Sequence, residues 1–149
     1  MDLLAKLRGR SGDEVDDVPT AVMTPIVAAM LADGRVDEAE VLHVETICAT
    51  SPLFERNSSV QNERLILHVT RMVENRGPES MCRKAAAVLS PALRETAFVY
   101  ALRVIFSDGY VGDLERDVVG NLTDWLEIPE ERAAVMIDVA SVMQNGVDA

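Results

Sequence analysis

The chain has few aromatic residues, and this shortage disfavours a β-sheet core. Aromatic side chains make up 4% of the 149 residues, within a hydrophobic content of 48%. Strands favour aromatic residues, whereas the aliphatic side chains that dominate here pack well between helices. We therefore expect one all-helical domain, which at this length has enough apolar material for a core.

Basic residues are too few to balance the acidic ones. There are 14 Lys and Arg against 25 Asp and Glu, which gives a net charge of −11 at pH 7. This charge repels the phosphate groups of nucleic acids and of anionic lipid surfaces. We therefore expect no nucleic-acid partner, while a bound cation or a basic protein partner is compatible with the excess of carboxylates.

Cysteine is scarce, and long apolar runs are lacking. Cys48 and Cys82 form no CxxC pair, so we expect free, buried thiols in a reducing compartment. No apolar run reaches the length that spans a membrane, and the N-terminus lacks a signal-peptide core followed by a cleavage site. These features predict a cytoplasmic protein without an integral membrane segment.

Recognisable catalytic chemistry is lacking too. The sequence has no glycine-rich phosphate loop and no Ser or Cys nucleophile with an arguable base beside it. His43 and His68 are typical of solvent-facing or hydrogen-bonded helix residues. We therefore expect no enzymatic activity.

An acidic stretch, by contrast, occurs twice. DGRVDEAE at 33–40 and DGYVGDLE at 108–115 share Asp, Gly, Val and Glu at the same spacing, and every shared position lies 75 residues from its counterpart. Apolar residues flank both copies at equivalent positions. Each copy predicts a helix that ends at Asp-Gly, a turn with one buried Val, and a second helix, with carboxylates at the corner.

The corner chemistry differs between the copies. Gly34 and Gly109 suit the left-handed conformation that often ends a helix. In the first copy, Asp37 and Glu40 have the spacing of a capping box. In the second copy the cap position is a glycine, so we expect Glu115 to have no capping role. A pair of plain helix corners remains an open alternative.

The spacing from Gly to Glu also matches the second half of an EF-hand loop. The positions of the first EF-hand carboxylates hold apolar residues instead: Ala29 and Leu31 in one copy, Val104 and Phe106 in the other. Each copy therefore has about half of a ligand set.

The paired motif, in an acidic chain of this length, resembles the TerB-like family, which is associated with tellurite resistance and bacterial stress responses. The resemblance covers about Thr24 to Val142. It implies an all-helical fold with a pseudo-repeat and a divalent metal held by acidic residues. The metal ligands that it implies are Asp33, Glu40, Asp108 and Glu115 first, then Asp37 and Asp113. Gly112 stands where the first copy has Asp37, which argues against a second, equal site.

We predict that the two corners meet across an approximate two-fold axis and pool their carboxylates. Carboxylates gathered without a counter-charge repel each other, so a divalent cation is the natural neutraliser. Oxygen ligands favour Ca²⁺, Mg²⁺ or Mn²⁺. His43, one turn beyond Glu40, also allows a mixed site with Zn²⁺.

The chain divides into an N-terminal segment, 1–17, with a short helix and a flexible linker, and a helical domain, 18–145. We expect a single-domain bundle of about seven to eight helices with an internal pseudo-two-fold repeat. The first long helix starts at Pro19 or Pro25, and Ser58 with Gln61 caps a later one. On the last helix, the expected core face consists of Val135, Met136, Val139 and Val142.

The sequence thus predicts a cytoplasmic, metal-responsive helical module that binds other proteins. The protein-binding role and its stress-response setting are what the resemblance implies. One alternative is a metal-dependent hydrolase, because clustered carboxylates with two cations can activate water. The other is a metal-free helical scaffold.

Overall fold

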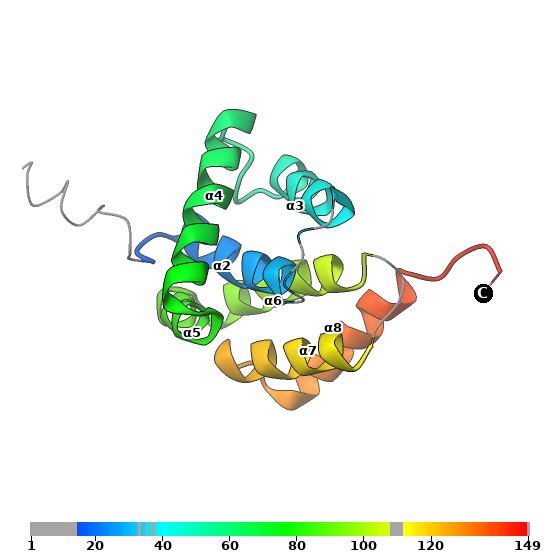
Figure 1. The fold of residues 1–149 in the computed structure, drawn as a ribbon. Coiled ribbons are helices and arrows are strands. Elements are labelled where there is room, and N and C mark those ends of the chain that lie inside the picture. The colour runs from blue at the N-terminus through cyan, green and yellow to red at the C-terminus, as the bar shows by residue number, and fades with distance from the viewer. Residues whose placement is uncertain (1–14, 33, 35, 37, 108–111, 149) are drawn as a thin grey trace, which may run out of the picture.

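The computed structural model describes residues 15–32, 34, 36, 38–107 and 112–148 (Figure 1). Within them it contains seven α-helices, no strand and one continuous core, which confirms an all-helical single domain. No helix in this part of the chain combines the length and the apolar character of a transmembrane span. The helices are α2 (Val18–Leu31), α3 (Glu38–Thr50), α4 (Ser59–Arg76), α5 (Pro78–Val88), α6 (Pro91–Ile105), α7 (Asp113–Trp125) and α8 (Glu130–Val142).

Two helices, α2 and α6, form the centre of the molecule. They make the most extensive contact between any two helices, and α4 and α5 also pack on α2. Both central helices have long apolar stretches, and α2 is buried from Thr20 to Met30. Because a helix that is apolar on all sides is stable only inside a protein, this sequence pattern fixes α2 at the centre.

The other helices of the described residues surround the two central ones, and α3 contacts α6 as well as α2. α2 contacts α3 and α4, and α6 contacts α7 and α8. α3 and α7 have the same length, and both bounds of α7 lie 75 residues after those of α3. The end of α3 is attached to α6 by the Tyr100 hydroxyl, which donates a 2.8 Å hydrogen bond to Ser51 Oγ.

The start of α2, which the sequence left between two prolines, lies at the first of them. The Thr20 N–H donates to Asp17 Oδ1 over 2.8 Å, so Asp17 is the N-cap and Pro19 lies in the first turn. Pro25 is inside the helix. Val15 is already buried, while the predicted short helix and most of the linker at 1–17 lie outside the described residues.

The predicted capping box before α4 is confirmed. The Gln61 N–H donates to Ser58 Oγ over 3.1 Å, and the Ser58 N–H donates to Gln61 Oε1 over 2.8 Å. Gly77, with φ 87°, separates α4 from α5. These boundaries depend on neighbouring residues only, which is why the sequence indicates them correctly.

The predicted core face of α8 is wrong except at Met136. Val135, Val139 and Val142 are exposed, and Val139 keeps 54% of its surface accessible. α8 instead buries Ala133, Met136 and Ala140 and packs on α6. The helix has apolar residues on several sides, and small alanine side chains allow its backbone to approach α6 closely. At the surface, Arg132 of α8 forms a 2.6 Å ion pair with Glu95 of α6. The hydrogen bond from Arg132 lowers the pKa of the Glu95 carboxyl.

Candidate metal centre

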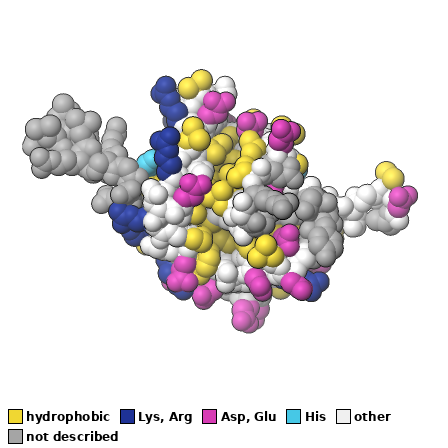
Figure 2. Space-filling model, viewed as in Figure 1, with side chains coloured by type: hydrophobic (Ala, Val, Ile, Leu, Met, Phe, Trp, Pro, Cys, Tyr) yellow, Lys and Arg dark blue, Asp and Glu magenta, His cyan; other side chains and the backbone are white. Residues whose placement is uncertain are grey.

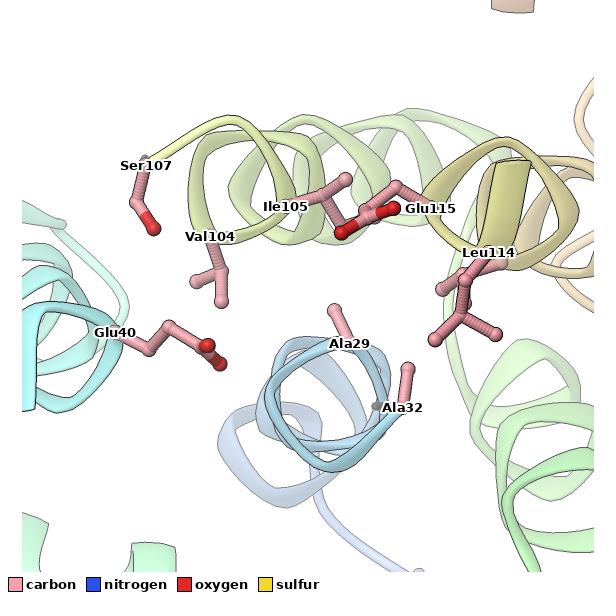
Figure 3. Close-up of a pocket in the computed structure, with 9 residues that line it drawn as sticks. Ala29, Ala32, Glu40, Val104, Ile105, Ser107, Leu114 and Glu115 are labelled. Carbon is pink, nitrogen blue, oxygen red and sulfur yellow. The ribbon is translucent and has the colours of Figure 1, made fainter. Parts of the chain in front are cut away.

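A small cavity lies where α2 and α6 end and where α3 and α7 begin (Figure 3). Its volume is about 30 Å³, enough for a cation or for one or two water molecules. The lining residues are Ala29, Ala32, Glu40, Val104, Ile105, Ser107, Leu114, Glu115 and Val118.

Positions of the two acidic copies and of the helices before them meet at this cavity. Six of the nine described residues that line it form three pairs whose members are 75 residues apart. The pairs are Ala29 with Val104, Ala32 with Ser107, and Glu40 with Glu115. The two corners, far apart in the sequence, therefore contribute to one partly open cavity.

Two carboxylates reach this space from opposite sides. Figure 3 shows Glu40 extending from α3 and Glu115 from α7, with both carboxylate groups turned toward the space between α2 and α6. Both side chains belong to half-buried residues. Their shared cavity, partly shielded from water, strengthens the attraction of a cation to the pair.

Contrary to the prediction from the sequence, Glu115 does cap its helix. The Gly112 N–H donates to Glu115 Oε2 over 3.1 Å. This half of a capping box needs only a backbone N–H at the cap position, which glycine supplies as well as any other residue. A carboxylate has about four lone-pair sites, so one capping bond leaves acceptor sites for a cation.

The structure brings two of the six predicted ligands to the cavity, Glu40 and Glu115. Asp113 is exposed in the first turn of α7 and is not one of the lining residues. The other three, Asp33, Asp37 and Asp108, lie outside the described residues. In the part of the chain that the structure describes, no three His, Cys, Asp or Glu residues gather as a metal-binding group.

The walls of the cavity are apolar where an EF-hand would supply ligands. Ala29 and Val104 occupy those positions, and Ile105 and Val118 lie beside them. The hydroxyl of Ser107 is an oxygen at the cavity that the repeated motif does not indicate, because Ser107 precedes the acidic stretch and has an alanine as its counterpart. Two carboxylates with retained water suit Mg²⁺, which is commonly bound through one or two carboxylates and keeps several waters.

The first corner has the expected glycine geometry but not the expected buried valine. Gly34 has φ 75°, and its N–H donates to the Leu31 carbonyl oxygen over 3.0 Å. Val36 is 55% exposed, so the prediction of a buried Val in this turn is wrong. Ala29 of α2 and Ala32, which follows the helix, line the cavity at this corner. The second-copy equivalents, Gly109 and Val111, lie outside the described residues.

Replacing Gly34 by Ala is expected to lower the free energy of unfolding by about 1–2 kcal/mol, because an L-residue is strained at positive φ. A Cβ there meets no atom within 4 Å, so the cost comes from the backbone alone. Gly120, exposed inside α7, is the matched control, and Gly120→Ala should stabilise by about 0.5–1 kcal/mol. Urea unfolding measures both, and equal effects of the two substitutions would contradict the corner geometry.

A hollow of about 180 Å³ adjoins the cavity and shares Ala32, Leu114 and Val118 with it. The single tryptophan, Trp125, lines this hollow from the last turn of α7. Glu115 lies in the first turn of the same helix, and Trp125 does not line the cavity, so its emission reports on the cavity only through α7 and the adjoining hollow.

No family model matches the chain, and no curated protein or solved structure is significantly similar to it.

Proposed function

We propose that the protein is a divalent-cation-binding helical module that acts by binding other proteins and carries out no reaction itself. One observation carries this proposal: Glu40 and Glu115, equivalent residues of the two acidic copies, line the same small cavity. A duplicated corner that supplies one carboxylate from each copy is a natural way to build a shared cation site. In this view the chain is an internal pseudo-two-fold repeat.

The proposed ion is Mg²⁺, Mn²⁺ or Ca²⁺. The groups available are carboxylate and hydroxyl oxygens, which these ions prefer. His43 is not one of the lining residues, so the described part of the cavity offers no nitrogen ligand that would favour Zn²⁺. Asp33, Asp37, Asp108 and Asp113 remain candidate ligands at the two corners.

The biological setting is proposed from the sequence resemblance. The paired Asp-Gly-x-Val-x-x-x-Glu corners are similar to those of the TerB-like family, and we propose a role in a bacterial stress response such as tellurite resistance. Cys48 and Cys82 are both free and buried, as is usual for proteins of a reducing compartment. We therefore propose a cytoplasmic location.

The cavity suits a bound ion. Its volume of about 30 Å³ holds an ion with a water molecule. A cation bound there contacts the first turns of both α3 and α7. It can therefore fix the positions of these two helices and, through them, the shape of the surface that they present to a partner.

Calorimetric titration of chelator-treated protein with Mg²⁺, Mn²⁺, Ca²⁺ and Zn²⁺ tests the proposal. We expect saturable binding of at least one oxygen-preferring ion. Glu40→Gln and Glu115→Gln should each weaken that binding at least tenfold, because each removes one charged ligand while keeping the side-chain shape. The emission of Trp125 provides a second readout.

Glu38→Gln is the matched control, because Glu38 lies in the first turn of α3 but does not line the cavity. It should leave the affinity within about twofold, which separates ligation from the general effect of charge at a helix start. Unchanged affinity in both the Glu40 and Glu115 variants would remove these residues from the site. Absence of any binding heat would favour the metal-free scaffold.

A further inference from the structure

A second, larger hollow lies between α3 and α4, with a volume of about 360 Å³. Figure 1 shows the first half of α4 set apart from α3, and α4 has only one buried residue, Asn62, before Val69. The hollow is thus an open groove between two helices rather than a gap in the core. We call it the α3–α4 groove.

The lining of the α3–α4 groove is part apolar and part polar. Phe54, which is 1% exposed, forms its apolar floor together with Cys48 and Ile66, and Asn57, Ser59 and Asn62 also line the groove. Burial, with a smaller effect from the nearby Glu45 carboxylate, raises the pKa of the Cys48 thiol to about 11. The thiol is therefore neutral at pH 7 and behaves as part of the apolar floor.

The rim of the groove is acidic. Glu45 on α3, Glu55 in the connection and Glu63 on α4 all line it, and all three are exposed. Within the described residues, no Lys or Arg forms an ion pair with any of them. Arg56 and Arg64 are their neighbours in the sequence but do not line the groove. Three carboxylates around an apolar floor therefore have their charges available to a ligand.

Exposed apolar side chains also lie next to the lining residues on both helices, although they do not line the groove themselves. Leu42, 62% exposed, lies one turn before Glu45 on α3, and Leu67, 56% exposed, follows Ile66 on α4. Figure 2 shows hydrophobic side chains gathered over the region between α4 and α3, with acidic side chains near them. Apolar surface of this kind, next to a hollow and edged by charge, is typical of a protein-binding surface.

We propose that the α3–α4 groove binds a segment of a partner protein in which large apolar side chains are flanked by Lys or Arg. The apolar side chain fills the hollow above Phe54, and the basic groups lie near Glu45, Glu55 and Glu63. An amphipathic basic helix has this chemistry, and helix-in-groove recognition is a common mode of peptide binding. This inference rests on the proposed function in so far as the ligand is a protein.

The groove and the cation cavity share one structural element, α3. Glu40 at the start of α3 lines the cavity, while Glu45 and Cys48 further along the helix line the groove. α3 buries only Val44, Ile47 and Cys48, so it is held less firmly than the central helices. A cation at its first turn would fix one wall of the groove, and we expect it to tighten partner binding.

The test uses a fluorescein-labelled twelve-residue peptide of Leu and Lys in helical spacing, with fluorescence anisotropy as the readout for the full chain. The double variant Glu55→Lys/Glu63→Lys should weaken binding at least tenfold. Glu130→Lys/Glu131→Lys is the matched control, because it changes the net charge equally on α8 and should have less than a threefold effect. Ile66→Ser should also weaken binding, and an all-Lys peptide should bind at least tenfold more weakly.

Three results would overturn the inference or part of it. An equal loss of affinity in both double variants would mean that the peptide responds to net charge alone and does not bind in the groove.

The first ten residues of the chain contain Leu3, Leu4 and Leu7 with three basic residues, so they share the chemistry of the proposed ligand. Tenfold tighter peptide binding after replacing these three leucines by Ser would identify that segment as the occupant and overturn a separate partner. If the peptide affinity depends on the groove residues but is unchanged by Mg²⁺, Mn²⁺ or Ca²⁺, the groove is supported as a binding site. Only its coupling to the cation would then be contradicted.

Discussion

Replacing Phe98 by Ala is expected to lower the free energy of unfolding by about 3–5 kcal/mol, which is the usual cost of removing a buried aromatic side chain. Phe98 is fully buried on α6, the helix that packs against α2 along the centre of the molecule. The substitution removes the largest fully buried side chain of this helix and leaves a cavity that neighbouring helices can fill only in part. Because the free energy of unfolding of a whole domain is about 5–15 kcal/mol, this substitution would remove much of it.

Urea unfolding followed by circular dichroism measures the change. Phe98→Leu retains most of the buried volume and should cost clearly less, while Val135→Ala on the exposed side of α8 should lie within about 0.5 kcal/mol of the unmodified chain. A small effect of Phe98→Ala, with an unchanged dependence on urea, would mean that α6 is not central to the core.

The boundaries of the helices could be predicted because they depend on local chemistry. Ser58 and Gln61 satisfy each other's backbone groups within four residues, and Pro78 and Pro91 each stand at the start of a helix. None of these contacts needs the rest of the chain to be in place. The two prolines alone do not fix the start of α2, because Pro19 and Pro25 both fit a first turn, and the Asp17 cap decides between them.

The buried face of α8 could not be predicted in the same way. Its sequence has valines on one side and smaller alanines with Met136 on another, so periodicity permits two answers. The larger valine side chains favour burial of the valine face. The contact with α6 instead buries the face that carries Ala133, Met136 and Ala140. A local pattern cannot contain this information, because it depends on how closely two backbones pack.

The cavity was partly foreseeable. Glu40 and Glu115 stand at equivalent positions of an internal repeat, and that spacing indicated that they act together. Their shared cavity also depends on apolar residues of α2 and α6, such as Ala29 and Val104, which have no chemical signature of their own. The sequence does not indicate the capping bond of Glu115 by a typical cap residue. Gly112 has no side chain at the cap position, and the bond uses its backbone N–H instead.

A cation that binds the cavity is expected to raise the melting temperature of the unmodified chain, and the double variant Glu40→Gln/Glu115→Gln should abolish that rise. A ligand that binds only the folded state stabilises it by about 2.7 kcal/mol at a concentration one hundred times its Kd. Each kcal/mol raises the melting temperature of a protein of this size by roughly 2–4 °C, so the expected shift is roughly 5–11 °C. Thermal unfolding followed by the emission of Trp125 measures it.

The glutamine substitutions keep the fold while removing the charges. After Glu115→Gln, the amide oxygen of the new side chain can still accept the hydrogen bond from the Gly112 N–H, so the start of α7 keeps its cap. Glu130→Gln/Glu131→Gln on α8 is the control, because it removes two charges from another first turn and should leave the full cation shift intact. If the Glu40→Gln/Glu115→Gln variant showed the same shift as the unmodified chain, the ion would be binding elsewhere. The two corners would then meet for structural reasons only, and Glu115 would serve as a helix cap.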